Sequence, residues 1–311
     1  MTRQKLIVLT GPTAVGKTAL SVKLAKQIDA EIISADSMQV YRYMDIGTAK
    51  VTPEEMQSVP HHLISVLDPK EEFNVCRFVQ MAKEAIKTIA DKGKIPLIVG
   101  GTGFYIHALL YDTDFSGSSG KTDYRLELEA MSDEVLHAKL AAVDPVSAET
   151  IHAHNRKRVI RALEYYHETN SPISLHNAKE RQKDSPYDFR YYVLTDERQK
   201  VYARIDTRVD RMIEDGLVDE VKNLQDMGYD RDLVSMQGIG YKEILDHLQG
   251  KYDLQEAIRI IKRDSRHYAK RQMTWFRREK DVRFIDRQAY GYDDDRILAE
   301  LLKDITNVKT V

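Results

Sequence analysis

The chain lacks paired cysteines, long apolar runs and an excess of one charge. Its 311 residues include only one cysteine, Cys76, so no internal disulfide can form, which favours a reducing compartment. No apolar run approaches the roughly 20 residues that span a bilayer, and the residues before Leu6 contain no apolar signal-peptide core. Because the net charge is only −2, binding to nucleic acid would need local basic patches. These absences predict a soluble cytoplasmic protein without membrane association.

The first motif present is a glycine-rich loop set between a strand and a helix. Residues 6–10 form a short apolar run, and residues 18–27 carry apolar side chains at helical spacing. Between them, GPTAVGKT matches the G-x-x-x-x-G-K-[ST] pattern, in which backbone N–H groups and a helix N-terminus bind phosphate. The Thr18 hydroxyl is the expected Mg²⁺ ligand. The predicted phosphate contacts are Gly11, Pro12, Thr13, Ala14, Val15, Gly16, Lys17 and Thr18.

Three more buried strands are predicted over residues 30–37, 94–101 and 188–197, with a helix over 75–92. Strands that alternate with helices are typical of a parallel sheet with ligands at its carboxyl edge. The predicted class is therefore α/β, a P-loop NTPase-like parallel sheet flanked by helices. After the last of these strands we expect mainly helix to about Lys280, followed by a charged tail.

Residues 115–187 break this alternation. A turn-rich segment, DTDFSGSSGKTD, leads into helical periodicity without a convincing buried strand. The chain therefore divides into a core domain of residues 1–114 and 188–311 and a helical insertion domain.

A phosphate loop does not by itself identify its ligand. A nucleotide kinase would usually end a neighbouring strand in an acidic residue that organises Mg²⁺. Here the strand over 94–101 runs into Gly100-Gly101-Thr102-Gly103, which contains no carboxylate, whereas the strand over 30–37 presents Asp36 near its end. Asp36 could bind a metal ion or accept a proton from a nucleophile.

Eight blocks between Gly11 and Arg277 resemble the tRNA dimethylallyltransferase (tRNA isopentenyltransferase) family, bacterial type. The phosphate loop is shared with many kinases, whereas the other seven blocks are not. The resemblance implies transfer of a dimethylallyl group from dimethylallyl diphosphate to N6 of the adenine immediately 3′ of the tRNA anticodon, with release of diphosphate. The blocks, in the family's order, are GPTAVGKT, DSMQVYRYMDIGTAK, PHHLI, GGTGFY, RVIRALE, ARIDTRVDRMIEDGLVDEV, QGIGYKE and YAKRQMTWFR.

The resemblance also implies catalytic roles. Asp36 matches the family's catalytic aspartate and would take the proton of the attacking amine, an effect typically worth ~10²–10⁴-fold. Thr102 matches a position near the reacting diphosphate, and Arg208 would be a second cation on it. The competing interpretations are a helix N-cap or metal ligand for Asp36 and a turn hydroxyl for Thr102. Arg204 and Arg211 are alternatives to Arg208.

The implied partner is the tRNA anticodon stem-loop, whose target base must leave its stack before it can react. Gln39 has the amide groups that an adenine edge requires. A second basic cluster, residues 262–280, has eight Lys or Arg and only two acidic residues; a solvated basic surface is its other interpretation. We expect the insertion domain to clamp the RNA and the protein to be a monomer. The predicted RNA contacts are Asp36, Ser37, Met38, Gln39, Arg125, Arg156, Lys157, Arg158, Val159, Ile160 and Arg161.

Two alternative functions stay open at this point. One is a small-molecule or nucleotide kinase, against which the glycine turn at 100–103 argues. The other is an RNA-binding P-loop protein without transfer chemistry, against which the intact Lys17, Thr18 and Asp36 argue.

Overall fold

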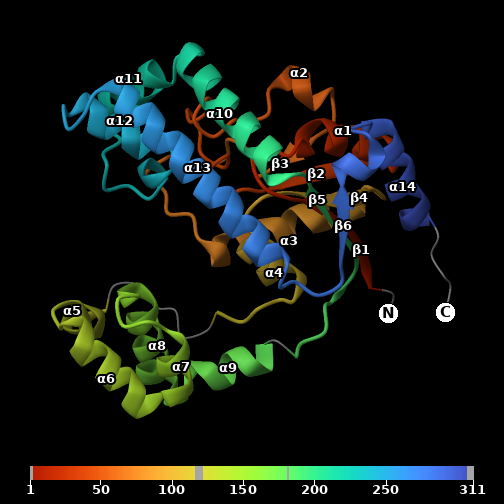
Figure 1. The fold of residues 1–311 in the computed structure, drawn as a ribbon. Coiled ribbons are helices and arrows are strands. Elements are labelled where there is room, and N and C mark those ends of the chain that lie inside the picture. The colour runs from red at the N-terminus through yellow and green to blue at the C-terminus, as the bar shows by residue number, and fades with distance from the viewer. Residues whose placement is uncertain (1–2, 116–121, 181, 307–311) are drawn as a thin grey trace. The chain divides into compact units, whose positions relative to one another are not determined.

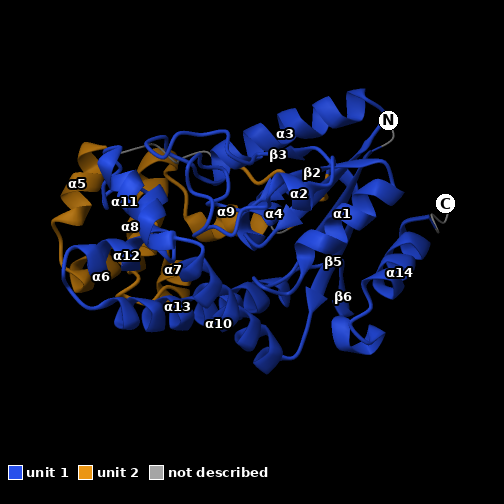
Figure 2. Ribbon diagram, turned by 90° about the horizontal axis from the view of Figure 1, so that it is seen from above, with its two compact units in different colours: residues 1–110, 186–311 blue, residues 111–185 orange. Residues whose placement is uncertain are grey.

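The computed structural model describes residues 3–115, 122–180 and 182–306 (Figure 1). Contacts divide the chain into unit 1, residues 1–110 and 186–311, and unit 2, residues 111–185 (Figure 2). These limits lie a few residues from the predicted domain boundaries. Part of the predicted turn-rich entry, residues 116–121, falls outside the described residues.

Unit 1 contains a six-stranded sheet in which every pair of neighbouring strands is parallel. Its order is β3-β2-β4-β1-β5-β6. All six residues of β2 are buried, as expected for a strand of a parallel sheet covered on both faces. The predicted α/β class is confirmed. The strands are β1 (Gln4–Thr10), β2 (Ala30–Ala35), β3 (His61–His62), β4 (Ile95–Gly100), β5 (Tyr187–Thr195) and β6 (Val282–Asp286).

The register of the central strands brings three sequence motifs to one edge. Gly100 at the end of β4 is paired with both Thr10 of β1 and Ala35 of β2. The Thr10 hydroxyl donates to the Gly100 carbonyl at 2.6 Å, and a Cβ on Gly100 would lie 2.2 Å from the Ala35 carbonyl oxygen. Only glycine fits there. The phosphate loop, Asp36 and the turn that follows β4 therefore start side by side.

Helices cover the sheet and extend beyond its edge (Figure 1). Helices α1 and α14 pack together, and their apolar side chains join those of β1, β5 and β6 in one core cluster. Among the described residues, no helix is long and apolar enough to cross a membrane. The helices of unit 1 are α1 (Lys17–Gln27), α2 (Pro53–Met56), α3 (Val75–Asp91), α4 (Gly103–Leu110), α10 (Arg198–Glu214), α11 (Leu217–Asp226), α12 (Tyr241–Leu248), α13 (Leu254–Phe276) and α14 (Asp294–Thr306), with short 3₁₀ turns η1 (Ser235–Gln237) and η2 (Arg287–Tyr290).

The C-terminal segment is not the charged tail that we expected. It forms the edge strand β6 and helix α14, in which Ile285, Ile297 and Leu301 are buried. The prediction was wrong because charged residues outnumber these few apolar side chains. An edge strand and a surface helix each need only one apolar face.

The described residues of unit 2 form helices joined by turns and contain no strand, as the periodicity indicated. Its helices bury an apolar cluster of their own that includes Leu128, Leu136, Leu140 and Leu163. Two N-caps shape it: the Ser132 side chain accepts from the Val135 N–H, and the Asp144 carboxylate accepts from Ser147. The helices are α5 (Asp123–Glu129), α6 (Asp133–Val143), α7 (Pro145–Thr150), α8 (Arg156–Thr169) and α9 (Ile173–Glu180).

We predict that Leu301→Ala lowers the free energy of unfolding by about 2–5 kcal/mol, because truncating a fully buried leucine leaves a cavity. Lys303→Ala, at an exposed position of the same helix, should change it by less than about 0.5 kcal/mol. Urea unfolding of both variants tests the packing of α14. Equal effects would mean that this helix does not belong to the core.

Candidate active site

The phosphate loop joins β1 to α1 and is held by side chains from three distant segments. Gly16 has a φ of 98°, a left-handed conformation that favours glycine. Arg287 donates to the Val15 carbonyl at 2.6 Å, and Arg204 donates to the Ala14 carbonyl at 2.8 Å. The Thr13 N–H donates to Gln272 Oε1 at 2.9 Å. These contacts hold the Ala14 and Val15 carbonyls and the Thr13 N–H against neighbouring segments of the protein.

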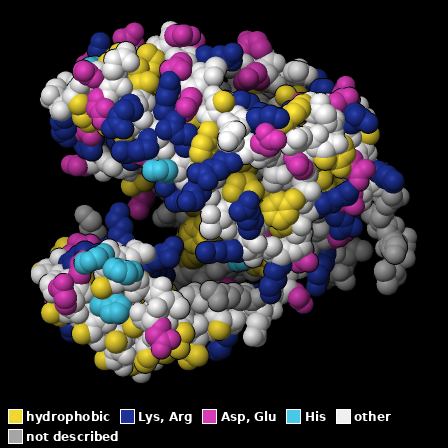
Figure 3. Space-filling view, viewed as in Figure 1, with side chains coloured by type: hydrophobic (Ala, Val, Ile, Leu, Met, Phe, Trp, Pro, Cys, Tyr) yellow, Lys and Arg dark blue, Asp and Glu magenta, His cyan; other side chains and the backbone are white. Residues whose placement is uncertain are grey.

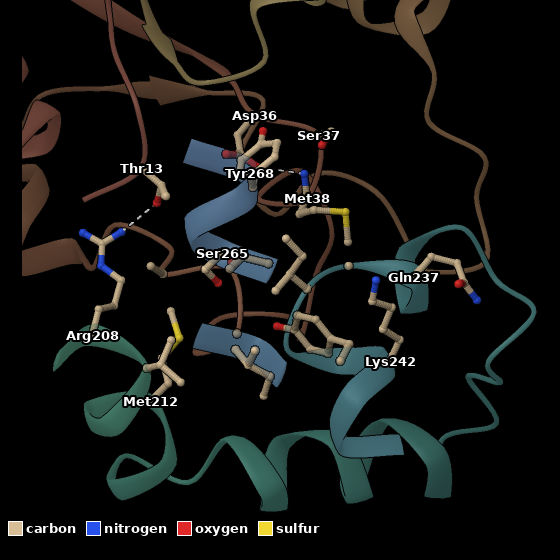
Figure 4. A pocket seen from close by; sticks show the side chains of 18 of the residues that line it. Thr13, Asp36, Ser37, Met38, Arg208, Met212, Gln237, Lys242, Ser265 and Tyr268 are labelled. Carbon is tan, nitrogen blue, oxygen red and sulfur yellow. Dashed lines mark hydrogen bonds between the residues drawn. The ribbon is translucent and has the colours of Figure 1, made fainter. Parts of the chain in front are cut away.

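Two cationic side chains meet at this loop. Lys17 Nζ donates to the Gly11 and Pro12 carbonyls, each at 2.9 Å. Arg208 projects from α10 and donates to the Thr13 hydroxyl at 3.3 Å (Figure 4). Among the described residues, neither cation has a carboxylate within ion-pair distance. Their juxtaposition leaves local positive charge that an anionic ligand would neutralise.

The pKa values of Lys17 and Arg208 are both lowered, which means that their charged forms are disfavoured in the folded protein. Burial and the Arg208 charge lower the pKa of Lys17 to about 7, and the Asp36 carboxylate offsets only part of that shift. Burial also lowers the pKa of Arg208 from its ordinary value. A bound phosphate would reverse both effects, because an opposite charge favours the protonated form.

Asp36 follows β2 directly and anchors a turn with one carboxylate oxygen. Its Oδ1 accepts from the Met38 N–H at 2.8 Å and from the Gln39 N–H at 3.3 Å. Figure 4 shows Asp36 beside Tyr268 at one end of a pocket. Burial and the Asp36 charge raise the pKa of Tyr268 to about 12. No helix begins at Asp36, so it is not the helix N-cap of the competing interpretation; it caps a turn and lines the pocket.

Gln272 ties the turn after β4 to the phosphate loop. Its Nε2 donates to the Gly101 carbonyl at 2.9 Å while its Oε1 accepts from Thr13. A Cβ on Gly101 would lie 2.1 Å from that nitrogen. The neighbouring Thr102 hydroxyl is buried without a well-formed hydrogen bond to any described residue. An interaction with the Thr102 side chain offsets part of the rise in the pKa of Tyr268, so these two hydroxyls lie together beside the turn after β4.

The pocket has a volume of about 410 Å³. Thr13, Asp36 and Arg208 are among its polar lining residues, and Figure 4 shows α10 and α13 contributing side chains to its walls. Apolar side chains from these helices and the segments between them form much of the remainder. They are Ile205, Val209, Met212, Val234, Ile239 and Ile261. The cavity can thus hold an anion at one end and an apolar group beside it.

The Gln39 side chain is bonded to the loop of residues 48–49 and to β2. Its Nε2 donates to the Thr48 and Ala49 carbonyls at 3.3 and 3.2 Å, and its Oε1 lies 3.4 Å from the Ser34 hydroxyl. It is also absent from the pocket lining, whereas Ser37 and Met38 are part of it. The Gln39 amide groups are therefore bonded within the protein, and contact of Gln39 with an adenine edge stays a prediction.

The predicted contacts in unit 2 separate into three kinds. Val159 and Ile160 are buried in the core cluster, where they attach α8 to the unit; their contact with RNA stays a prediction. Arg125 donates to the buried Glu164 carboxylate at 3.0 Å, and Arg156 donates to Asp133 at 2.9 Å. A third group, Lys157, Arg158 and Arg161, lies on the same helix, and the first two side chains are exposed.

The basic cluster of residues 262–280 is partly neutralised. Lys and Arg side chains gather along α13 on the face of unit 1 seen in Figure 3. Lys262, Arg263 and Arg266 each form an ion pair with an Asp side chain. By contrast, Lys270 and Arg277 are exposed and have no carboxylate partner among the described residues. The C-terminal half of α13 therefore carries the more available positive charge.

Comparisons with known proteins agree with this geometry. The family model described as IPP transferase matches residues 39–279, and the one described as isopentenyl transferase matches residues 4–67. The chain belongs to this family. A tRNA dimethylallyltransferase of Lachnoclostridium phytofermentans is 54% identical to it over 99% of each chain. The predicted family and a transferase activity are confirmed.

Solved structures of the family have the same fold. A tRNA isopentenylpyrophosphate transferase of Bacillus halodurans matches with a TM-score of 0.75 and 46% identity over 97% of this chain and 96% of that one. One from Staphylococcus epidermidis gives 0.73 and 40% over 97% and 99%. A eukaryotic dimethylallyltransferase acting on tRNA gives 0.84 and 32% over 98% and 80%.

Four site residues were not singled out from the sequence: Arg204 as a loop ligand, Tyr268, Gln272 and Arg287. Three of them lie within the family blocks, but the blocks do not show which side chains face the loop. Arg287 lies beyond the last block, in the segment expected to be a charged tail. For Arg204, Tyr268 and Gln272 the only signal in the sequence is that they lie within a family block, and Arg287 has no such signal.

We predict that Lys17→Met raises the thermal stability of the unliganded protein more at pH 6 than at pH 10. The unfolded chain keeps this proton up to about pH 10.5 and the folded chain only to about 7. Between these values the unfolded state binds more protons, so stability rises with pH. The cost of the buried ammonium is therefore full below pH 7 and disappears toward pH 10.5.

Differential scanning calorimetry at both pH values tests this, with Lys26→Met as a control at an exposed position of α1. Inorganic diphosphate should stabilise the natural protein more than Lys17→Met. An equal effect of Lys17→Met at both pH values would contradict a desolvated ammonium group.

Proposed function

We propose that this family member transfers a dimethylallyl group from dimethylallyl diphosphate to N6 of the adenine immediately 3′ of the anticodon in tRNA, releasing diphosphate. The observation that carries the proposal is the pair of cations Lys17 and Arg208 at the phosphate loop, which have no carboxylate within ion-pair distance among the described residues. Arg208 and Asp36 both line the adjoining pocket. Relatives named for this reaction support it.

The proposed step breaks the allylic carbon–oxygen bond and forms a bond from that carbon to the adenine N6. The electron pair of the broken bond leaves on the diphosphate, whose growing charge Lys17, Arg208 and the loop N–H groups stabilise. The proton on N6 passes to the Asp36 carboxylate. Thr102 would bind a substrate oxygen through its buried hydroxyl.

Mg²⁺ is the proposed cofactor, with Thr18 as its protein ligand. Thr18 lies exposed in the first turn of α1, directly after Lys17. The described residues contain no cluster of three acidic, His or Cys side chains that would form an all-protein metal site. A single hydroxyl fits Mg²⁺, which commonly takes few protein ligands together with phosphate oxygens and water. When bound, it would supply further positive charge to the diphosphate.

For the RNA, we propose the anticodon stem-loop as the partner, with contacts from Ser37 and Met38 at the pocket and from the exposed Lys157 and Arg158 of unit 2. The tRNA-binding role of unit 2, the cytoplasmic location and the monomeric state stay predictions.

An assay that supplies unmodified tRNA, Mg²⁺ and either labelled dimethylallyl diphosphate or ATP separates this function from a kinase. Label incorporated into tRNA supports the proposal. Phosphoryl transfer or ATP hydrolysis without incorporation supports a kinase, and RNA binding without either supports a binding protein.

We predict that Asp36→Asn lowers kcat at least about a hundredfold, because the amide cannot take the N6 proton. Its oxygen can still accept from the Met38 N–H, so the affinity for inorganic diphosphate should change by less than about threefold. The control Asp29→Asn removes a carboxylate that is 79% exposed and should leave kcat unchanged. Single-turnover prenylation measures the step directly, and near-normal turnover of Asp36→Asn would remove the base assignment.

Charge reversal in unit 2 tests the proposed RNA contacts. We expect the double variant Lys157→Glu with Arg158→Glu to raise the KM for RNA at least about tenfold and to reduce the salt slope of binding by roughly one per lost phosphate contact. Lys139→Glu, at an exposed position of α6, is the matched control. An unchanged KM with the double variant would show that this face of α8 does not meet RNA.

A further inference from the structure

Glu220, on α11, binds a loop that lies next to the candidate base. Its carboxylate accepts from three consecutive backbone N–H groups, those of Asp45 at 2.9 Å, Ile46 at 2.7 Å and Gly47 at 3.1 Å. Its Oε1 also accepts from the Tyr241 hydroxyl at 2.6 Å. A carboxylate with this many donors is strongly held, because hydrogen bonds to a charged group are stronger than neutral ones.

The loop that Glu220 holds, residues 45–49, is part of the pocket wall. Gly47, Thr48 and Ala49 line the same cavity as Asp36. The Tyr241 ring packs against Gly47 so closely that a Cβ there would lie 2.5 Å from a ring carbon. The loop therefore depends on Glu220 for its N–H groups and on Tyr241 for its lateral position.

A continuous chain of bonds leads from this loop to Asp36. The Thr48 and Ala49 carbonyls accept from Gln39 Nε2. The Gln39 backbone N–H in turn donates to Asp36 Oδ1. At 3.3 Å this bond supports the 2.8 Å bond that the Met38 N–H donates to the same oxygen, so Gln39 contributes to holding the carboxylate. The residues of this chain come from three family blocks, DSMQVYRYMDIGTAK, ARIDTRVDRMIEDGLVDEV and QGIGYKE.

We propose that Glu220 is a positioning residue for the reaction: it holds the 45–49 loop so that Gln39 fixes the Asp36 carboxylate in its proton-accepting orientation. This inference rests on the proposed function. It gives Gln39 the role of a link between the loop and the base.

The main test compares Glu220→Gln with Asp219→Asn, which removes one negative charge at a 78% exposed position of the same helix. In Glu220→Gln an N–H₂ group replaces one of the carboxylate oxygens that accept from the N–H groups of residues 45–47 and from the Tyr241 hydroxyl. Some of these hydrogen bonds are then lost, so we expect the 45–49 loop to become more mobile. With unmodified anticodon stem-loop RNA and dimethylallyl diphosphate, we expect Glu220→Gln to lower kcat at least about tenfold. The affinity for inorganic diphosphate should change by less than about twofold. Hydrogen exchange of residues 45–49 should accelerate, and Asp219→Asn should change none of these.

A double-mutant cycle separates positioning from general structural support. If Glu220 acts through Asp36, adding Glu220→Gln to Asp36→Asn should lower kcat by less than about twofold further. Three results would overturn the inference. They are a double variant whose loss of kcat is the product of the two single losses, a parallel fall in diphosphate affinity, and a normal kcat in Glu220→Gln.

Two further measurements keep the result unambiguous. Tyr241→Phe removes only one of the four bonds and should give a smaller loss of kcat in the same direction; if Glu220→Gln does not fold, a normal kcat in Tyr241→Phe overturns the inference. If the natural protein does not prenylate RNA, the proposed function fails. If it does, and Asp36→Asn is inactive while Glu220→Gln is normal, only the positioning role fails.

Discussion

The meeting of two cations, Lys17 and Arg208, at one phosphate loop is the constraint on which the site depends. Burial and the Arg208 charge lower the pKa of Lys17, and burial also lowers the pKa of Arg208. Neither side chain has a carboxylate within ion-pair distance among the described residues. The fold tolerates this because the loop is fixed from outside by Gln272, Arg204 and Arg287. A site with two buried cations binds an anion favourably. It also stabilises a transition state in which the negative charge of that anion increases.

The leaving-group chemistry explains why a phosphate loop suits a prenyltransferase. In a kinase the loop holds the group being transferred, whereas here it would hold the group that departs. The turn after β4 then has no need of a metal-binding carboxylate, and glycines let β2 and β4 approach closely. Asp36, directly after β2, is the proposed proton acceptor, and one of its carboxylate oxygens accepts from the Met38 and Gln39 N–H groups of a turn.

The parallel sheet accounts for the convergence of these parts. Its register aligns Thr10, Ala35 and Gly100, so the segments that follow β1, β2 and β4 leave the sheet at one edge. Helices α10 and α13 extend across that edge and contribute Arg208, Tyr268 and Gln272. Because the side chains come from rigid elements, the site is assembled when the core folds.

The sequence by itself determined the phosphate loop, the α/β class, the helical insertion and the family, because each depends on local periodicity or on contiguous motifs. It also indicated Asp36, Thr102 and Arg208. Only the tertiary structure decided that Val159 and Ile160 are core residues, that Gln39 is a link, and that the C-terminal segment completes the sheet. These depend on which face of an element is covered and on which distant carbonyl accepts a bond. The sequence does not show that Glu220 accepts from the N–H groups of residues 45–47. These residues are far apart along the chain and meet only when the helices pack.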